Sequence, residues 1–402
     1  SDIDNFEDDG YENTSINLKT GLNINENNRI ELSHNIINTK SEYDNNVYNL
    51  DYSKNLIKSA NSKGDELKTK NSYSSLAYLN KNDFSDLKFY TNYSKINRDD
   101  PTGDTKEFDG TLKEFGSNIT IPYLNESSFV QLGVDDKITN HKNDVNKELN
   151  NEGIFATNST KFNNTIFTQS LRHDNYDLFN DKTTGKIEIK HYFMDDLSLA
   201  TNYGTAYNVP TFYKLYDSYA GNNDLEPETT KSKDISLAYK DFSLTYFHNN
   251  IDNMIEYNSN TYQYYNMSEE ITLKGYELAY KKDLIEDTFV GIAYTKLSAK
   301  DENNMDLQRR AKDSVKFGVD YYGITKTHLN FNGEYVGKRK EYDFGTYDIK
   351  AETGNYTLWN SIVNYEINKT FSTYLKVNNI FNKYYQTIDG YATAERSAYL
   401  GL

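Results

Sequence analysis

Apolar and polar residues alternate along most of the chain with a period of two, which is typical of β-strands. Near the start, Ile16, Leu18, Leu22 and Ile24 are separated by Asn, Lys and Gly residues. The same alternation recurs in Leu87–Tyr93, Val130–Val134, Ile235–Tyr239, Tyr276–Tyr280, Val290–Tyr294, Val315–Tyr321, Leu329–Tyr335 and Trp359–Ile367. The pattern predicts an all-β protein of about 19 strands, each with its connection taking about 21 residues.

The predicted connections alternate between short and long. Short ones lie near Glu26–Asn28 and Phe162–Asn164, and long ones run through Ser41–Thr69 and Tyr207–Thr230. Short turns at one rim and long loops at the other are typical of outer-membrane barrels, in which the short turns face the periplasm. We therefore predict one transmembrane antiparallel β-barrel domain over residues 1–402.

The aromatic composition favours a membrane barrel over a soluble β-protein. The 402 residues include 37 Tyr and 20 Phe but 1 Trp. A soluble sandwich would bury mainly Val, Ile and Leu, whereas tyrosines at strand ends form the aromatic girdles of membrane barrels. No apolar run approaches the roughly 18 residues of a membrane helix. A large soluble β-protein stays an alternative, which extraction without detergent would reveal.

Charge and chemistry exclude other classes. The 44 basic and 60 acidic residues give a net charge of −16, which argues against a nucleic-acid partner. The chain has no Cys, so disulfides and thiolate sites are excluded. It has no phosphate-binding glycine loop, nucleophile elbow or carboxylate pair that strand geometry would hold in a dry pocket, so we expect no enzymatic activity.

The alternation also predicts which side chains face lipid and which face the lumen. A strand points successive side chains to opposite faces. We expect the lumen to receive Glu277, Lys316 and Asp320, and lipid to receive Tyr276, Leu278, Tyr280, Val315, Phe317 and Val319.

Strand parity predicts that the barrel is incomplete in this chain. The first short turn follows the first strand, so that strand starts at the long-loop rim. The last predicted strand, Thr393–Leu402, ends at the short-turn rim. Bacterial barrels have an even number of strands, so we expect an odd number of strands before Ser1 and an unpaired neighbour beside the first strand.

Four segments resemble TonB-dependent outer-membrane receptors. Asn202–Tyr239 resembles their loop-and-strand signature, and Leu375–Leu402 resembles their C-terminal strands. Ile251–Tyr280 and Asp306–Tyr322 are most similar to the cobalamin (corrinoid) receptor subfamily. The resemblance implies a 22-stranded barrel in the outer membrane of a Gram-negative cell. About 19 of its strands would lie in this chain, from which the plug domain, the first strands and the TonB box would be absent.

The resemblance implies capture and import of cobalamin or a related corrinoid. Its partners would be outer-membrane lipid and the TonB–ExbB–ExbD complex, acting through the missing plug. A haem receptor or a ferric-siderophore receptor is the alternative within this class. His141 and His173, on or beside long loops, are the candidate haem contacts or else solvated loop residues. A passive porin of 16–18 strands is the alternative from another class.

Several loop residues are candidates for ligand contact. Arg309, followed by Arg310, either binds polar ligand groups or balances Asp301 and Glu302. The loop Gly221–Pro227 is either a ligand-binding segment or a turn held by Asx-type hydrogen bonds. Loop tyrosines offer a broad amphipathic surface to a large ligand or belong to the outer girdle, and they are Tyr216, Tyr219, Tyr264, Tyr265 and Tyr391.

An acidic cluster predicts a calcium site. Glu7, Asp8 and Asp9 precede the first strand, and Asp44 follows the second. These strands form a hairpin, so their loop ends lie side by side. Carboxylates without basic partners repel one another, and calcium accepts six to eight oxygen ligands in flexible geometry. The resemblance adds that cobalamin receptors have calcium-binding acids at positions that Glu7, Asp9 and Asp44 match. The alternative is a solvated acidic loop.

Overall fold

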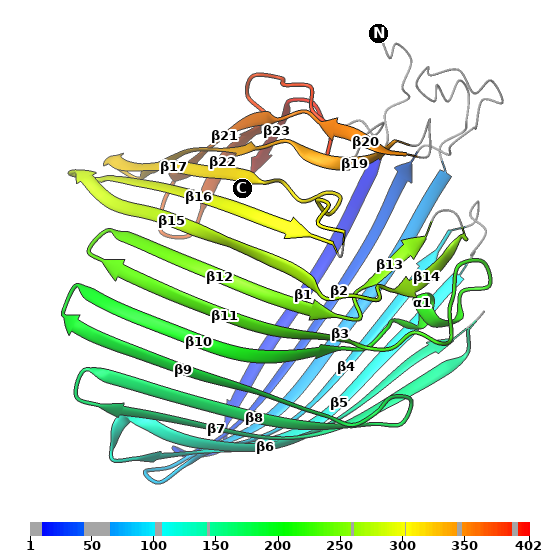
Figure 1. The fold of residues 1–402 in the computed structure, drawn as a ribbon. Helices are drawn as coiled ribbons and strands as arrows, with labels where there is room; N and C mark the ends of the chain where they lie inside the picture. The colour runs from blue at the N-terminus through cyan, green and yellow to red at the C-terminus, as the bar shows by residue number, and fades with distance from the viewer. Residues whose placement is uncertain are drawn as a thin grey trace. The chain divides into compact units, whose positions relative to one another are not determined.

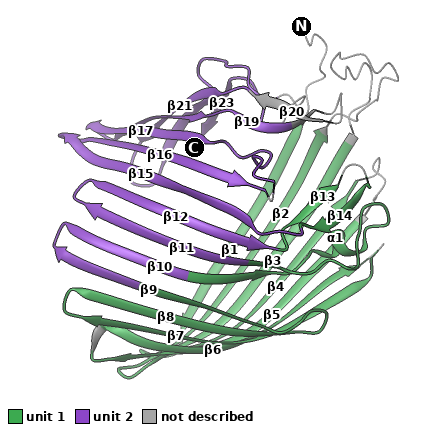
Figure 2. Ribbon diagram, viewed as in Figure 1, with its two compact units in different colours: residues 1–188, 204–229, 253–267 green, residues 189–203, 230–252, 268–402 purple. Residues whose placement is uncertain are grey.

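The computed structural model describes residues 10–43, 65–100, 107–142, 145–258, 261–301, 303–343, 348–387 and 393–402. Figure 2 shows the chain divided into two compact units. Unit 1 consists of residues 1–188, 204–229 and 253–267, and unit 2 of residues 189–203, 230–252 and 268–402.

The described residues are almost entirely β-structure (Figure 1). They form a main sheet of 19 strands, in agreement with the predicted number for this chain, and two separate two-stranded hairpins. The strands of the main sheet are β1 (Tyr11–Asn23), β2 (Asn28–Tyr43), β3 (Asp65–Lys81), β4 (Asp86–Asp99), β5 (Glu107–Tyr123), β6 (Asn125–Lys142), β7 (Lys147–Phe162), β8 (Thr165–Tyr176), β9 (Lys182–Met194), β10 (Leu197–Asn208), β11 (Glu228–Tyr239), β12 (Phe242–Asp252), β15 (Ile271–Ile285), β16 (Thr288–Lys300), β17 (Asp313–Ile324), β18 (Thr327–Val336), β21 (Tyr356–Glu366), β22 (Ser372–Asn378) and β23 (Ser397–Gly401).

In unit 1, strands β1 to β8 pair antiparallel, each with the next along the chain. The β1–β2 ladder runs from Tyr11 opposite Ser41 to Asn23 opposite Arg29. The turn after β3 is closed by Asn82, whose Oδ1 accepts hydrogen bonds from the backbone N–H groups of Phe84 (2.9 Å) and Ser85 (3.0 Å). The short turns that the sequence predicts near Glu26–Asn28 and Phe162–Asn164, after β1 and β7, are confirmed.

In unit 2, β12 pairs with β15, and β15, β16, β17, β18, β21, β22 and β23 then pair in that order. Between β12 and β15 the chain forms a small separate hairpin of β13 (Ile255–Asn258) and β14 (Gln263–Asn266). Between β18 and β21 the chain forms a second hairpin of β19 (Arg339–Asp343) and β20 (Asp348–Thr353). The last strand is shorter than predicted, since it begins at Ser397 rather than at Thr393.

The register gives each ladder one apolar and one polar face. In unit 2 it places the six side chains predicted to face lipid on one face and Glu277, Lys316 and Asp320 on the other. In unit 1 the apolar face carries, among others, Leu76, Phe89, Phe115, Val134 and Ile154, which are 47–59% exposed. A soluble protein would bury such side chains, so this exposure fits a wall whose outer face meets lipid.

The long connections contain structure that the alternation did not predict. The connection after β10 holds one short helix, α1 (Phe212–Tyr216), and the hairpin β13–β14 lies between β12 and β15. The long connection predicted at Ser41–Thr69 begins later and ends earlier, because β2 extends to Tyr43 and β3 begins at Asp65. Among the described residues, no helix is long and apolar enough to cross a membrane.

Candidate functional site

The connections after β10 and β12 fold together into one structure, here called the loop cap. It consists of α1, residues 217–227 and the hairpin β13–β14 (Figure 1), all within unit 1 (Figure 2). Its centre is a small apolar core of Leu215, Leu225 and Ile255, which are 4–6% exposed. Phe179, Tyr216 and Tyr264 pack against this core.

Local hydrogen bonds start and end α1. Thr211 is the N-cap, and its hydroxyl accepts a hydrogen bond from the backbone N–H of Lys214 at 3.3 Å. After the helix, Asp217 Oδ1 accepts from the N–H groups of Tyr219 and Ala220, both at 3.1 Å. A helix of five residues is too short to persist alone, so α1 depends on the burial of Leu215 in the loop cap.

Asparagine side chains connect the two halves of the loop cap. Asn222 Nδ2 donates to the carbonyl of Tyr264 at 2.9 Å, and Asn222 Oδ1 accepts from the N–H of Asp224 at 2.9 Å. Asn266 Nδ2 donates to the carbonyl of Glu226 at 2.9 Å. The interpretation of Gly221–Pro227 as a turn held by Asx-type bonds is confirmed.

The loop cap presents a group of aromatic rings, here called the tyrosine surface. Its members are Tyr213, Tyr219, Tyr257, Tyr262 and Tyr264. Ring centroids of Tyr213 and Tyr264 lie 6.2 Å apart, and those of Tyr257 and Tyr264 lie 5.3 Å apart. Tyr219 and Tyr262 lie 5.9 Å apart, and Tyr219 is 71% exposed. Five rings with several open faces offer a wide contact area at low conformational cost.

Three phenol groups of this surface have pKa values above the usual value, so they stay protonated at neutral pH. Burial raises the pKa values of Tyr213, Tyr257 and Tyr264, to which nearby Asp217 contributes. Each hydroxyl can therefore both donate and accept a hydrogen bond. The surface is suited to a large, partly apolar ligand with polar groups on its edge.

Four of the predicted tyrosines lie in the loop cap, but they do not share one environment. Tyr219 and Tyr264 belong to the tyrosine surface, whereas Tyr216 packs against the apolar core. Tyr265 lies on the other face of the hairpin, opposite Glu256. Tyr391 lies outside the described residues.

Sequence reasoning missed three members of the tyrosine surface: Tyr213, Tyr257 and Tyr262. The signal for one of them was the alternation of tyrosines in the hairpin, because the register that pairs Tyr257 with Tyr264 puts both rings on one face.

Arg309 lies in unit 2 and pairs with an acid. Its Nε is 2.9 Å from Oε1 of Glu341, whose side chain is fully buried. Its backbone N–H donates to the carbonyl of Lys340 at 2.8 Å. Arg309 thus connects the loop before β17 to the hairpin β19–β20. It balances Glu341 rather than Asp301, whose carboxylate caps its own turn by accepting from the N–H groups of Asn303 and Met305.

Neither histidine considered for haem is a loop residue. His141 is 8% exposed on β6, with its ring 4.4 Å from that of Phe108 and 6.3 Å from that of Phe212 in α1. His173 lies within β8, where its Nδ1 is 2.9 Å from the hydroxyl of Thr183. His141 therefore joins the strand wall to the loop cap.

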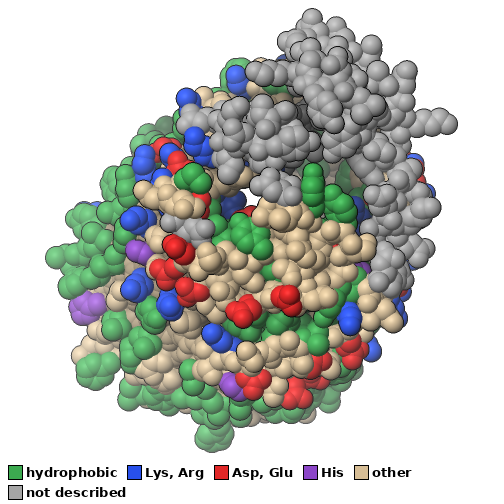
Figure 3. All heavy atoms as spheres, turned by 45° about the vertical axis from the view of Figure 1, so that its right-hand side comes forward, with side chains coloured by type: hydrophobic (Ala, Val, Ile, Leu, Met, Phe, Trp, Pro, Cys, Tyr) green, Lys and Arg blue, Asp and Glu red, His purple; other side chains and the backbone are tan. Residues whose placement is uncertain are grey.

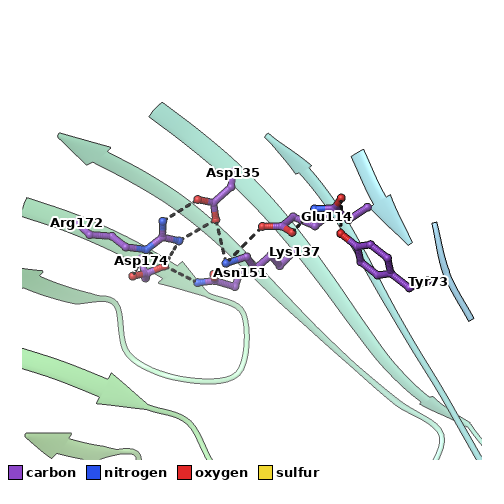
Figure 4. A network of polar contacts seen from close by, with 8 residues as sticks. Tyr73, Glu114, Asp135, Lys137, Asn151, Arg172 and Asp174 are labelled. Atoms are coloured by element: carbon purple, nitrogen blue, oxygen red, sulfur yellow. Dashed lines mark hydrogen bonds and ion pairs between the residues drawn. The ribbon is translucent and has the colours of Figure 1, made fainter. Parts of the chain in front are cut away.

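The polar face of unit 1 holds a network of charged groups, here called the wall network (Figure 4). Arg172 on β8 makes two hydrogen bonds to Asp135 on β6 at 2.7 and 2.8 Å. It also contacts Asp174 at 2.7 Å, and Asn151 Nδ2 donates to Asp174 at 3.1 Å. Lys137 Nζ lies 3.6 Å from Asp135 and 3.7 Å from Glu114.

The wall network is neutralised internally. Asp135 and Asp174 are each 7% exposed, and each is paired with the Arg172 guanidinium. Buried carboxylates need such partners, because an unpaired charge away from water is strongly destabilising. The network therefore ties together the strands β5 to β8.

The predicted calcium ligands Glu7, Asp8, Asp9 and Asp44 lie outside the described residues. The prediction that the loop ends of the first two strands lie side by side is confirmed, because Gly10 and Glu42 hydrogen-bond to each other at the ends of β1 and β2. Within the described part of the chain, no group of three or more His, Cys, Asp or Glu side chains could hold a metal ion. The calcium site stays a prediction.

The space-filling view of the loop side shows where side chains of each kind gather (Figure 3). Hydrophobic side chains lie along the left and lower margins of this view, and acidic and basic side chains lie between them. Exposed apolar strand faces, short turns at one rim and long loops at the other are together typical of outer-membrane β-barrel proteins.

A family model described as "TonB dependent receptor-like, beta-barrel" matches residues 1–380. The chain therefore belongs to the TonB-dependent receptor family, and its place is the outer membrane of a Gram-negative cell. The family consists of receptors and transporters, in line with the prediction of no enzymatic activity. Membership also removes the passive porin.

Among curated relatives, the vitamin B12 transporter BtuB of Vibrio cholerae is 29% identical over 265 residues. That match covers 63% of this chain and 42% of the relative, so the chain spans less than half the length of the relative.

Solved structures of this family share the fold. The siderophore receptor PirA from Acinetobacter baumannii has a TM-score of 0.81 at 15% identity, over 98% of this chain and 70% of the other. The FrpB iron transporter from Neisseria meningitidis has a TM-score of 0.77 at 15% identity, over 97% and 71% of the two chains.

Proposed function

We propose that this chain is the barrel part of a receptor that captures cobalamin or a related corrinoid and imports it with energy delivered through the TonB–ExbB–ExbD complex. One observation carries the choice of ligand: the sequence identity of 29% over 265 residues to a vitamin B12 transporter. The solved receptors are 15% identical, so their likeness supports the fold and not the ligand.

The proposed capture step takes place on the tyrosine surface. A corrinoid has a wide, partly apolar ring with amide side chains at its edge. The exposed faces of Tyr219 and Tyr257 can stack on that ring, and neutral phenol hydroxyls can bond to the amides. Tyr216 packs against the apolar core of the loop cap, against which Tyr264 of this surface also packs.

The runner-up is a ferric-siderophore receptor. Its support is the fold likeness to the siderophore receptor PirA. A haem receptor has less support, because His141 is buried between aromatic rings and His173 lies within β8.

Calorimetry of the complete receptor in detergent tests these ligands against one another. Cyanocobalamin, haemin and a ferric catecholate siderophore are titrated separately. We expect binding heat with cyanocobalamin alone. The proposal is lost if cyanocobalamin gives no heat while haemin or the siderophore binds tightly.

We also propose that calcium at Glu7, Asp8, Asp9 and Asp44 orders the loops beside β1 and β2 and raises ligand affinity. The mutual repulsion of these carboxylates supports the proposal. Ligand affinity is measured with calcium and with a chelator, for the parent protein and for Asp9→Asn with Asp44→Asn. We expect the chelator to weaken binding in the parent but not in the double variant. An unchanged parent affinity would show that the cluster is only surface charge.

A further inference from the structure

Near the loop end of unit 1, the apolar face of strands β1 to β5 changes from apolar to polar side chains. At this boundary lies a groove of about 450 Å³, whose lining includes Thr14, Asn38, Lys70 and Asn97. The same lining carries three carboxylates, of which Glu12 lies opposite Lys40, Asp99 lies opposite Lys68 and Asp109 pairs with Lys95. The register places these four side chains in one row across four neighbouring strands. Adjacent strands lie about 4.8 Å apart, so Lys70 and its two asparagine neighbours span about 10 Å.

Lys70 carries the uncompensated charge of this row. In the described part of the chain it has no carboxylate within 4.0 Å, and its cross-strand neighbours are the neutral Asn38 and Asn97. The lysines around it are already paired: Lys40 and Lys68 with Glu66, and Lys95 with Asp109. The row thus combines one free ammonium group with three hydroxyl and amide side chains that can hydrogen-bond.

An apolar strip continues directly below this row toward the short turns. On β1, Ile16, Leu18 and Leu22 are 54–65% exposed on the same face. Ile36 lies opposite Ile16. Two residues along a strand span about 7 Å, so Ile16 and Ile36 lie one step below Thr14 and Asn38. On β3 and β4 the residues one step below the row are the polar Ser72 and Lys95. In a membrane barrel this is the depth at which lipid headgroups meet the acyl chains.

From this placement we propose that the row Thr14, Asn38, Lys70 and Asn97 binds the phosphate of an outer-membrane lipid whose acyl chains lie on the strip of Ile16, Leu18 and Ile36. The Lys70 ammonium contacts a phosphate oxygen, and the asparagine amides and the Thr14 hydroxyl donate to the others. Charge complementarity favours this occupant, because phosphate is anionic and the free group of the row is cationic. The apolar strip favours a lipid over free phosphate, which has no acyl chains to bury.

Native mass spectrometry of the complete receptor in neutral detergent tests the proposal. The probes are dioleoyl phosphatidic acid, dioleoylglycerol with the same chains but no phosphate, and inorganic phosphate as competitor. We expect the receptor to retain phosphatidic acid in preference to dioleoylglycerol, with inorganic phosphate failing to displace it.

Two variants change the row, and one is a matched control. Lys70→Gln should reduce retained phosphatidic acid about five-fold, the effect of one lysine beside an anionic headgroup. Asn38→Asp, which puts a carboxylate beside Lys70, should reduce it at least as much. Lys19→Gln removes an exposed lysine from the polar face of β1 and should change nothing. Three results would each overturn the proposal: equal binding of the two lipids, equal loss in Lys70→Gln and Lys19→Gln, or displacement by inorganic phosphate.

Discussion

The wall network and the loop cap belong to the same unit but are held together differently. In the wall, long antiparallel ladders position the strands, and Arg172 ties β8 to β6 through paired charges. In the loop cap, three buried apolar side chains and the amides of Asn222 and Asn266 hold the segments together. We therefore expect the wall to be a stiff frame and the loop cap to open locally while the ladders persist.

This difference supports the proposal that ligand recognition takes place at the loops. Buried charges in the wall are already paired, so they have no free bonding capacity for a ligand. In the tyrosine surface, Tyr213, Tyr219, Tyr257 and Tyr262 are 42–71% exposed. Loops on a rigid scaffold are the usual place for binding residues, because their sequence can change without loss of the fold.

The largest expected effect comes from removing the central charge of the wall. Arg172→Ala removes the guanidinium from the buried Asp135 and Asp174, which keep Lys137 at 3.6 Å and the Asn151 amide at 3.1 Å. We expect the free energy of unfolding to fall by about 3 kcal/mol. Urea unfolding of the protein in detergent measures it. The control is Arg98→Ala, which breaks a 3.7 Å pair of a half-exposed side chain and should cost less than about 1 kcal/mol. Equal losses would show that the wall network has no special role.

A core change in the loop cap should act locally. Leu225→Ala removes one of the three central side chains, and we expect about 2–3 kcal/mol of local destabilisation. Amide hydrogen exchange should rise across α1 and β13–β14 while strands β3 to β8 keep their protection. Leu178→Ala, at a residue 43% exposed, is the matched control. Exchange that rises equally in the strands would contradict the separation of the two regions.

The tyrosine surface should affect ligand affinity and not stability. Tyr219 is 71% exposed, so Tyr219→Ala should leave unfolding unchanged. The loss of one stacked ring should weaken cyanocobalamin binding by about 1 kcal/mol, or about five-fold in Kd. Calorimetry compares it with Tyr246→Ala, whose ring is 45% exposed on β12. A larger loss in the strand variant would place the ligand elsewhere.

The smallest expected effect concerns the loop after β16 in unit 2. Ion pairs hold this loop, as they do the wall network, but here the charged groups are partly exposed to water. Lys300 and Lys312 contact Asp306 at 2.6 and 2.5 Å and hold the pKa of its carboxyl below the usual value. Because the folded pKa is lowered, this stabilisation is present above the unfolded value of about 3.9 and is lost as the pH falls below it.

Amide exchange of the loop after β16, corrected for intrinsic rates, measures this pH dependence. We expect a loss of at most about 1 kcal/mol in acid, since the lysines are partly exposed. Asp306→Asn should remove the pH dependence. An equal acid response in that variant would assign it to another group.

The sequence allowed the strands and their faces to be predicted, because each strand records its own alternation. Val315, Phe317 and Val319 need no distant partner to be recognised as one face. The loop cap could not be predicted in the same way. Leu215, Leu225 and Ile255 follow no period, and they meet only because two connections fold onto each other. The wall network could not be predicted either, because Asp135 and Arg172 lie on strands separated by β7 and no local pattern connects them.

By itself, the sequence determined the all-β class, the number of strands in the main sheet, the alternation of short turns and long loops, and the resemblance to TonB-dependent receptors. These features are local, or they accumulate along the chain one hairpin at a time. Tertiary structure alone decided that Tyr257 faces the same side as Tyr264, that Arg309 pairs with Glu341, and that no carboxylate of the described residues pairs with Lys70. Each of these three contacts or orientations depends on residues that are distant in the sequence. The pairing of strands and loops brings those residues together, and the sequence pattern of one strand does not show that pairing.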